Sequence, residues 1–310
     1  MIIVEANNNI HCRWREGRER RTSIDLNYKP YLYIDRGQEM PEVIEVKNRF
    51  GTNRIRPSYT FGDWVNIDKE PLVKVAFETT GDLYNGRDNW GKTYEADISM
   101  ARKYANEYEL RKWYFDIETQ VGGRYNEAVN ALTFYDSYDE EYFIMTWFPR
   151  EPLPQYDNVL VYEDEQEMLE AFVSFVEEKD PDIIIGWYVL GFDIPAILKR
   201  LIKNDINPRR LSPYNEVKGV THNEAKYVNY TNTAQPIKGR LTYCLMTRFE
   251  RLWIDSQRGT LPSLSLDYCS KLLLGDNSGK EKTNAKFKEH EFFQRSWLED
   301  TEVFLEYNRV

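Results

Sequence analysis

Two acidic residues, Asp116 and Glu118, lie near the end of the apolar run Lys112–Thr119. The run is typical of a buried strand, and side chains alternate along a strand with period two, so both carboxylates project from one face. Two carboxylates held so close repel each other unless a cation or a shared proton relieves them. Oxygen-rich acidic clusters suit Mg²⁺ or Mn²⁺. The alternative is an edge strand whose alternate residues face water.

A third acid, Asp193, follows an apolar strand-like run over residues 182–185 and a turn marked by Gly186 and Gly191. After it, apolar residues recur at helical spacing: Ala196, Ile197, Leu198, Leu201 and Ile202. Asp193 is therefore expected at a junction between strand and helix, where its carboxylate could face the pair on the first strand. The alternative is an N-terminal helix cap, a common role for Asp that is worth about 1 kcal/mol.

The elements that must position these acids follow from local patterns. Residues 128–135 and 141–147 predict two strands joined as a hairpin through residues 137–140. Glu165–Lys179 predicts a helix that Asp180-Pro181 ends. Its apolar stripe is expected to pack in the core: Met168, Leu169, Phe172, Val173 and Val176.

The C-terminal third has weaker patterns. Residues 203–238 are polar and rich in Asn, Pro and Tyr, which favours an extended excursion over the domain or a plain surface insertion. Residues 252–255 predict a short strand that ends at Asp255, a tempting fourth ligand. Residues 264–274 predict a helix closed by Gly275, and residues 301–310 predict a last helix.

The N-terminal third predicts short strands over residues 2–4, 22–26 and 30–34, a pattern typical of a small α+β domain. The basic run at residues 13–21 could contact phosphate or a stacked base. A solvated hairpin is favoured, because acids interrupt the run and Gly17 marks a turn. Residues 81–92 predict a loop, and residues 98–110 a helix that leads into the next domain.

Composition excludes several classes of protein. The 310 residues exceed one usual core, so two domains are expected, and acids outnumber Lys plus Arg by 51 to 41, which argues against a histone-like binder. Three cysteines without a C-x-x-C pair and three histidines argue against zinc and against a disulfide scaffold. No run approaches the ~18 apolar residues of a membrane span. We expect a soluble, intracellular protein that does not enter a membrane.

The motif order resembles a known family. Phe115-Asp116-Ile117-Glu118 is similar to the first exonuclease motif of the 3′→5′ proofreading domain of family B DNA polymerases. The segment from Gly186-Trp187 to Phe192-Asp193-x-Pro195 is similar to the second. Further matches extend over most of the chain, at residues 94–98, 101–104, 132–137, 210–213 and 263–268. The last three of these stretches look most like the viral and phage members.

This resemblance implies an α/β fold. A ribonuclease-H-like 3′→5′ exonuclease domain would occupy residues 109–310, and a smaller α+β N-terminal domain on the template side would occupy residues 1–108. Tyr307 would begin the third motif, Tyr-x-x-x-Asp, whose aspartate would come directly after Val310. We therefore expect the 310-residue chain to end inside that motif and to be weak or inactive as an exonuclease.

The resemblance also implies two-metal hydrolysis of 3′-terminal nucleotides with Mg²⁺ or Mn²⁺. Asp116 would bridge both ions, Glu118 would bind the nucleophile-side ion, and Asp193 would hold the leaving-group-side ion. Tyr307 would hydrogen-bond the attacking water. Tyr188, where the family usually has Asn, and Phe192 would contact the substrate. The family counterpart of Asp255 is not a ligand, so we expect a structural role for that residue.

The implied partners are single-stranded DNA or primer-template DNA and the remaining polymerase domain, encoded in the same gene or as a split partner. A viral or phage origin would place the protein in the host cytoplasm. Two alternatives stay open. One is a stand-alone 3′→5′ exonuclease, and the other is a catalytically inactive DNA-binding or polymerase-assembly module.

Overall fold

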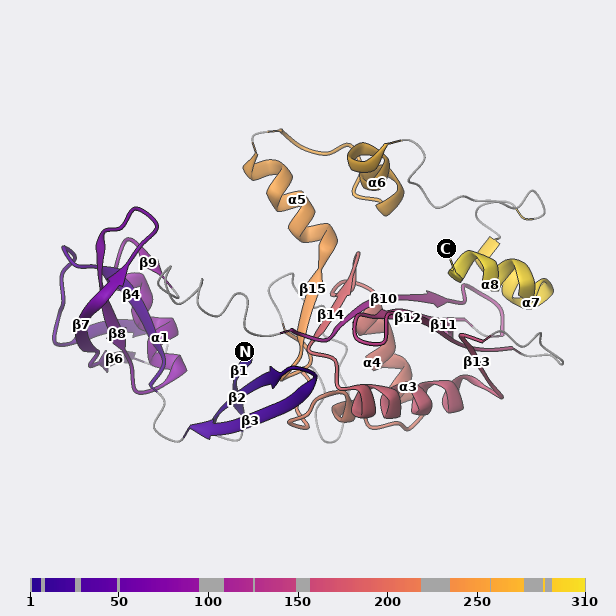
Figure 1. Ribbon diagram of the computed structural model, residues 1–310, viewed down its shortest axis with the longest axis horizontal. Coiled ribbons are helices and arrows are strands. Elements are labelled where there is room, and N and C mark those ends of the chain that lie inside the picture. Colours follow the sequence, from indigo (N-terminus) through magenta and orange to yellow (C-terminus); the bar gives the residue numbers. More distant parts are fainter. Residues whose placement is uncertain are drawn as a thin grey trace. The chain divides into compact units, whose positions relative to one another are not determined.

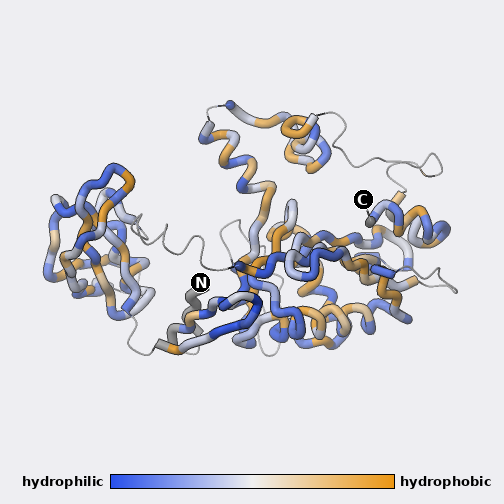
Figure 2. Tube along the Cα trace, viewed as in Figure 1, coloured by the Kyte–Doolittle hydropathy of each residue, from blue (hydrophilic) through white to orange (hydrophobic). Residues whose placement is uncertain are grey.

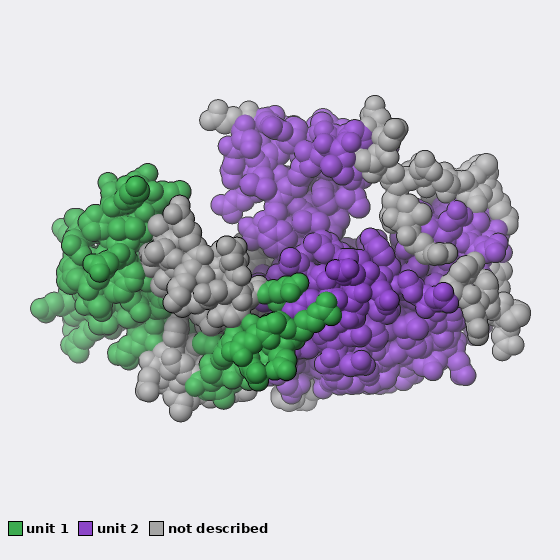
Figure 3. Space-filling view, in the orientation of Figure 1, with its two compact units in different colours: residues 1–109 green, residues 110–310 purple. Residues whose placement is uncertain are grey.

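Two units make up the structure, a computed structural model: residues 1–109 and residues 110–310 (Figure 3). The structure describes residues 2–6, 9–25, 29–48, 51–94, 109–124, 126–148, 157–218, 235–256, 258–275, 287 and 292–309. Most of the helix expected over residues 98–110, and two stretches matched to the family at 95–98 and 101–104, lie outside these described residues. None of the helices in the described ranges has the length and apolar character needed to cross a membrane.

The first unit is built mainly from antiparallel strands. Its elements are β1 (Ile2–Ala6), β2 (Asn9–Glu16), β3 (Glu19–Asp25), β4 (Tyr31–Asp35), β5 (Ile44–Asn48), β6 (Gly51–Ile55), β7 (Ser58–Val65), β8 (Pro71–Ala76), α1 (Thr80–Gly86), η1 (Arg87–Asn89) and β9 (Thr93–Tyr94). The sheets have the orders β1-β2-β3, β7-β8-β4-β9 and β5-β6. The hairpin expected around Gly17 is confirmed: β2 pairs with β3, and Gly17 has φ +59°.

The loop predicted for residues 81–92 is wrong in part, because α1 and η1 occupy residues 80–89. Thr79 caps α1 by accepting a hydrogen bond from the Asp82 N–H at 3.0 Å. A Cβ on Gly86 would lie 2.9 Å from the Phe77 ring, so the glycine that suggested a loop allows close packing of the helix end. The Thr79 cap and the close packing of Gly86 offset the weak helix propensity of the glycines.

The second unit is built around a six-stranded sheet of order β13-β12-β11-β10-β14-β15 (Figure 1). The strands are β10 (Lys112–Thr119), β11 (Val129–Asp136), β12 (Glu141–Trp147), β13 (Val159–Tyr162), β14 (Ile183–Gly186) and β15 (Leu241–Cys244). β11 is antiparallel to β10 and β12, whereas β10–β14, β14–β15 and β12–β13 are parallel pairs. The first strand and the hairpin predicted from the sequence are confirmed.

Helices α3 (Glu165–Lys179) and α4 (Asp193–Lys203) cover one face of this sheet (Figure 1). Hydrophobic and hydrophilic residues alternate along α3 (Figure 2), and its apolar stripe is buried as predicted. Alternate residues of β10 meet that stripe: the Phe115 and Phe172 rings stack with centroids 5.7 Å apart. Asp164 caps the start of α3, and Asp180 ends it with φ +46°.

The remaining elements of the described chain are η2 (Pro208–Leu211), α5 (Leu245–Asp255), α6 (Leu266–Leu274), α7 (Phe292–Glu299) and α8 (Thr301–Arg309). The last two lie over the other face of the sheet, where the Trp297 Nε1–H donates to the Trp147 carbonyl at 2.7 Å. The strand predicted for residues 252–255 is wrong, because they form the last turn of α5. Four residues are too few to distinguish a strand from one turn of an amphipathic helix.

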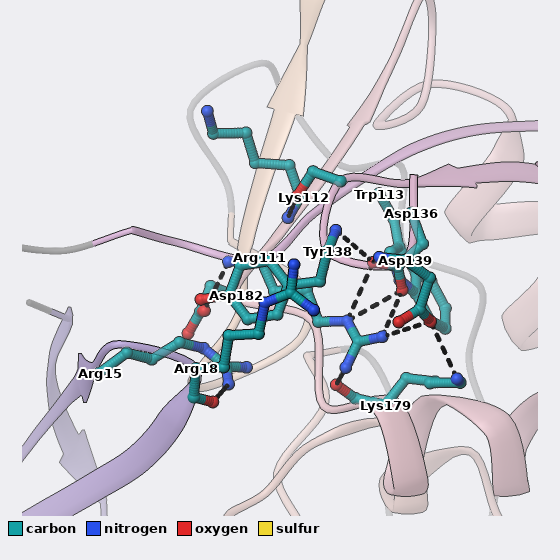
Figure 4. A network of polar contacts seen from close by, with 11 residues as sticks. Arg15, Arg18, Arg111, Lys112, Trp113, Asp136, Tyr138, Asp139, Lys179 and Asp182 are labelled. Carbon is teal, nitrogen blue, oxygen red and sulfur yellow. Dashed lines mark hydrogen bonds and ion pairs between the residues drawn. The ribbon is translucent and has the colours of Figure 1, made fainter. Parts of the chain in front are cut away.

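A polar network around Arg111 secures the start of β10 (Figure 4). The guanidinium donates to both Asp136 carboxylate oxygens and to Asp139 Oδ2 at 2.8–3.1 Å, and also to the Lys179 carbonyl at 2.9 Å. Its backbone N–H donates to Asp182 Oδ2 at 2.9 Å. One side chain therefore joins β10, the β11–β12 turn and the end of α3.

Candidate active site

Asp116 and Glu118 project from one face of β10, as the period of a strand requires. Asp116 pairs with Thr133 and Glu118 with Ala131 of β11, and the register shifts directly after Glu118. Asp116 is exposed and Glu118 is half-buried. Strand β10 is central in the sheet, with β11 and β14 as neighbours, so the edge-strand alternative is wrong.

Asp193 is the first residue of α4, and the residue at the N-cap position is Phe192. Asp193 is therefore not the cap that the alternative interpretation required. Its side chain is buried, and its Oδ1 accepts a hydrogen bond from the Ile117 backbone N–H at 3.2 Å. Ile117 lies between Asp116 and Glu118, so this bond brings an acid 76 residues away to the strand that carries the other two.

Burial, and after it the nearby Asp116 carboxylate, raise the pKa of Asp193 to about 7. Hydrogen bonds from backbone N–H groups, including that of Ile117, oppose the rise but do not cancel it. Each pKa unit corresponds to ~1.4 kcal/mol between the protonated and ionised forms. The ionised pair is thus costly unless positive charge accompanies it.

Tyr307 belongs to α8 and is half-buried, with its ring centroid 5.1 Å from that of Phe292. Burial raises the pKa of the Tyr307 phenol, and the Glu118 and Asp116 carboxylates add to the rise. Both acids of β10 therefore act on the phenol electrostatically. The hydroxyl remains protonated at neutral pH and can act as a hydrogen-bond donor.

The donor set of the site consists of carboxylate and phenol oxygens, which suits a hard divalent cation. The repulsion between Asp116 and the buried Asp193 also fits a cation. However, the described ranges contain no group of three His, Cys, Asp or Glu residues that could hold a metal ion. The structure thus brings Asp193 to β10 without joining all three acids into a ligand group.

Tyr188 and Phe192 lie in the turn between β14 and α4, and their side chains are 45% and 44% exposed. The Tyr188 carbonyl accepts hydrogen bonds from the Gly191 and Phe192 N–H groups at 2.9 and 3.0 Å. The Tyr188 ring lies over Gly191, where a Cβ would come within 2.1–2.6 Å of it. Two exposed aromatic side chains therefore border the buried Asp193.

Sequence reasoning missed the ion pair between Glu165 of α3 and Arg200 of α4, both of which are buried. Glu165 Oε1 also accepts from the Val129 N–H of β11 at 2.8 Å, so the pair joins α4, α3 and the sheet. The signal was an arginine inside the apolar stripe of α4. By contrast, Asp255 is exposed at the end of α5, where Arg251 pairs with it at 3.8 Å.

Residues 58–250, more than half of the chain, match the family model of the DNA polymerase family B exonuclease domain. The chain belongs to the family B DNA polymerases. The matched span contains Asp116, Glu118 and Asp193, whereas Tyr307 lies beyond it. The resemblance inferred from the motifs is confirmed.

The chain is similar to curated DNA polymerases of archaea and phages. It is 27% identical over 292 residues to a DNA polymerase of Thermococcus litoralis, a match that covers 86% of this chain and 16% of the relative. It is 26% identical to the DNA-directed DNA polymerase of Enterobacteria phage T4, over 70% of this chain and 27% of the relative. It is 24% identical to the DNA-directed DNA polymerase of Escherichia phage RB69, over 91% of this chain and 33% of the relative. The chain thus spans a third or less of the length of these relatives.

Proposed function

We propose that residues 110–310 form a 3′→5′ exonuclease unit that removes 3′-terminal nucleotides from single-stranded or frayed DNA, as in proofreading. The observation that carries the proposal is the hydrogen bond from Ile117 to Asp193. It gathers acids from two segments that are separate in sequence at one end of β10. Burial and the nearby Asp116 carboxylate raise the pKa of Asp193, and groups with perturbed pKa values are frequent at functional sites.

The proposed fold of this unit is ribonuclease-H-like. Its support is a mixed sheet with parallel and antiparallel pairs, helical crossovers on one face, and acids on the central strand. The match to the family B exonuclease domain is the second support.

We assign a role to each side chain of the site. Asp116, Glu118 and Asp193 would hold two Mg²⁺ or Mn²⁺ ions, which when bound polarise the phosphodiester and acidify water. The protonated Tyr307 hydroxyl would donate a hydrogen bond at the same site and orient the attacking water. The exposed rings of Tyr188 and Phe192 would contact the terminal nucleotides. The bulk of Tyr188 favours stacking over the hydrogen bonds that an amide side chain would make.

The wider context is also a proposal. Residues 1–109 would act on the template side. The chain spans a third or less of the three polymerases compared above, so primer extension would reside in a further polymerase region, encoded in the same gene or as a separate partner.

A gel assay with 5′-labelled single-stranded DNA tests the proposed reaction. We expect slow shortening from the 3′ end, in line with the weak activity expected from the motifs, that requires Mn²⁺ or Mg²⁺ and is lost in Asp116→Asn and Asp193→Asn. A 3′-labelled strand should release its label in the first turnover. Hydrolysis that persists in both variants would exclude these acids from the reaction.

The second candidate is a non-enzymatic DNA-binding or assembly module. The lack of a three-residue ligand group within the described ranges favours it. The same assay separates the two candidates, because a module would bind single-stranded DNA without shortening it at any divalent-ion concentration.

A further inference from the structure

A row of tyrosines crosses the six-stranded sheet at right angles to its strands. In the pairing register, Tyr114 of β10 is opposite Tyr135 of β11, and Tyr135 is opposite Tyr142 of β12. On the other side, Tyr114 is aligned with Ile185 of β14, which is aligned with Tyr243 of β15. We call Tyr142, Tyr135, Tyr114 and Tyr243 the tyrosine row. Since paired residues share a face, all four side chains project from the same side.

That side also carries the acids of the candidate site. Asp116 is two residues beyond Tyr114, so it lies on the same face, about 7 Å further along β10. The opposite face is the packed one, where Trp113 stacks on Phe134 with centroids 4.4 Å apart. The tyrosine row is therefore no part of the hydrophobic core between the sheet and α3.

The rings of the row are accessible. Tyr142 is 56% exposed, Tyr114 47% and Tyr243 42%, and Tyr135 is half-buried between its neighbours. The ring centroid of Tyr135 lies 4.9 Å from that of Tyr142 and 6.1 Å from that of Tyr114, and both interplanar angles are near 50°. Within the described part of the chain, these four side chains make ring contacts and no hydrogen bonds, so their hydroxyls stay available.

Cationic side chains accompany the rings. Lys112 precedes Tyr114 by two residues on the same face and is exposed. The Arg248 guanidinium lies over the Tyr243 ring, 5.5 Å from its centroid. Exposed aromatic rings with interspersed cations are the combination that binds single-stranded nucleic acids, because bases stack on the rings and phosphates meet the cations.

The rings of the row are accessible, and helix α8 lies at the acid end of the same face, where Asp116 remains exposed. Helix α8 packs on that face through Phe304, whose ring contacts Phe148 at 6.0 Å, and it brings Tyr307 to the acids. From Tyr142 to Tyr243 the row crosses five strands, a length of about 19 Å at ~4.8 Å per strand, enough for several nucleotides.

We propose that the tyrosine row is a stacking surface for the unpaired bases of a DNA single strand whose 3′ end reaches Asp116. The inference rests on the proposed function for its polarity, because the acids define the end at which the strand is cut. We choose DNA as the occupant because the row is continuous with the acids and because cations flank its rings. Aliphatic side chains would favour a protein partner. The row contains none, and among the residues aligned with it only Ile185 is aliphatic.

The test is a binding assay in EDTA, so that it does not depend on hydrolysis. Fluorescence anisotropy would follow the full chain binding an oligothymidylate of about 16 nucleotides. We expect Tyr114→Leu and Tyr142→Leu each to weaken binding about fivefold or more, and Tyr114→Phe to stay within about twofold, because the ring stacks and the hydroxyl does not. Leu272→Ala is the control, since Leu272 is an exposed apolar side chain of α6 in the same unit and outside the row.

An oligonucleotide with abasic sites separates stacking from phosphate contacts. Wild type and Tyr114→Leu should bind the abasic oligonucleotide with equal affinity, whereas a general loss of structure would weaken the binding of both oligonucleotides. Circular dichroism checks folding, and Tyr142→Leu serves if Tyr114→Leu does not fold.

Equal affinity of wild type and both leucine variants for the oligothymidylate would overturn the proposal. If those variants instead changed the sedimentation of the protein and left DNA binding unchanged, the row would be a protein contact. Failure of the two proposals is distinguishable. If DNA binding requires the row but no 3′ hydrolysis occurs, only the proposed exonuclease function is wrong. If hydrolysis occurs but the leucine variants bind DNA normally, only the proposed role of the row is wrong.

Discussion

The carboxylate of Asp193 accepts a hydrogen bond from the backbone N–H of Ile117, at 3.2 Å, and so joins the first turn of α4 to the strand of Asp116 and Glu118. The bond is made to a residue whose own side chain is buried in the core. Strand and helix cannot slide past each other without breaking it. The geometry of the acids is thus set by backbone pairing and helix packing, and not by contacts among the acids themselves.

Stability should depend on pH through Asp193. Its pKa is about 7 in the folded chain, above the ordinary carboxyl value of 3.8, because of burial and Asp116. The folded state therefore holds the proton more tightly than the unfolded state. This contribution to the free energy of unfolding is full below about pH 4 and is lost as the pH rises through about 7, a change of a few kcal/mol.

Thermal melts in EDTA from about pH 5 to about pH 8 measure this effect. The melting temperature of wild type should fall relative to that of Asp193→Asn across this range, because the amide cannot ionise. Parallel curves for the two proteins would contradict the raised pKa.

Metal binding should require the acid of β10. We expect Mn²⁺ to bind wild type in a calorimetric titration and Asp116→Ala to bind at least about tenfold more weakly, a difference of ~1.4 kcal/mol. Asp255→Ala is the control, because Asp255 is exposed at the end of α5 and should leave the titration unchanged. Identical isotherms for wild type and Asp116→Ala would remove Asp116 from the ligand set.

Removal of the Arg111 side chain should lower the stability of the fold. Arg111→Leu leaves the fully buried Asp136 without its bidentate partner, and we expect a loss of about 3–5 kcal/mol in the free energy of unfolding. Urea unfolding monitored by tryptophan fluorescence measures it. Lys271→Ala is the control, because its exposed pair with Asp267 on α6 should be worth less than about 1 kcal/mol. A similar loss in both variants would show that the Arg111 network stabilises the fold no more than an exposed ion pair does.

Gly191→Ala should move the Tyr188 ring at little cost in stability. A Cβ at position 191 would lie 2.1–2.6 Å from the far end of that ring, which is half-exposed and able to swing away. We expect the free energy of unfolding to fall by less than about 1 kcal/mol. The affinity for single-stranded DNA should change as much as it does in Tyr188→Ala. The double variant should match either single variant, because both changes remove the same ring. Additive effects on affinity would separate Gly191 from Tyr188.

The strands and helices with strong local patterns were predictable. Lys112–Thr119 and Glu165–Lys179 have the predicted bounds, because alternation in the strand and the capped apolar stripe in the helix are properties of neighbouring residues. The predictions for residues 252–255 and, in part, 81–92 were wrong, because three apolar residues or a few glycines do not distinguish a helix from a strand or loop.

By itself the sequence determined the family motifs, the acids that belong to them, and the spacing that places Asp116 and Glu118 on one face. Only the tertiary structure decided that Asp193 bonds to Ile117 instead of capping its helix, and that Tyr114, Tyr135, Tyr142 and Tyr243 share one face. The physical reason is strand register. Register makes neighbours of residues far apart in the chain, and it is set by the burial of whole strands and helices, which no local pattern of residues records.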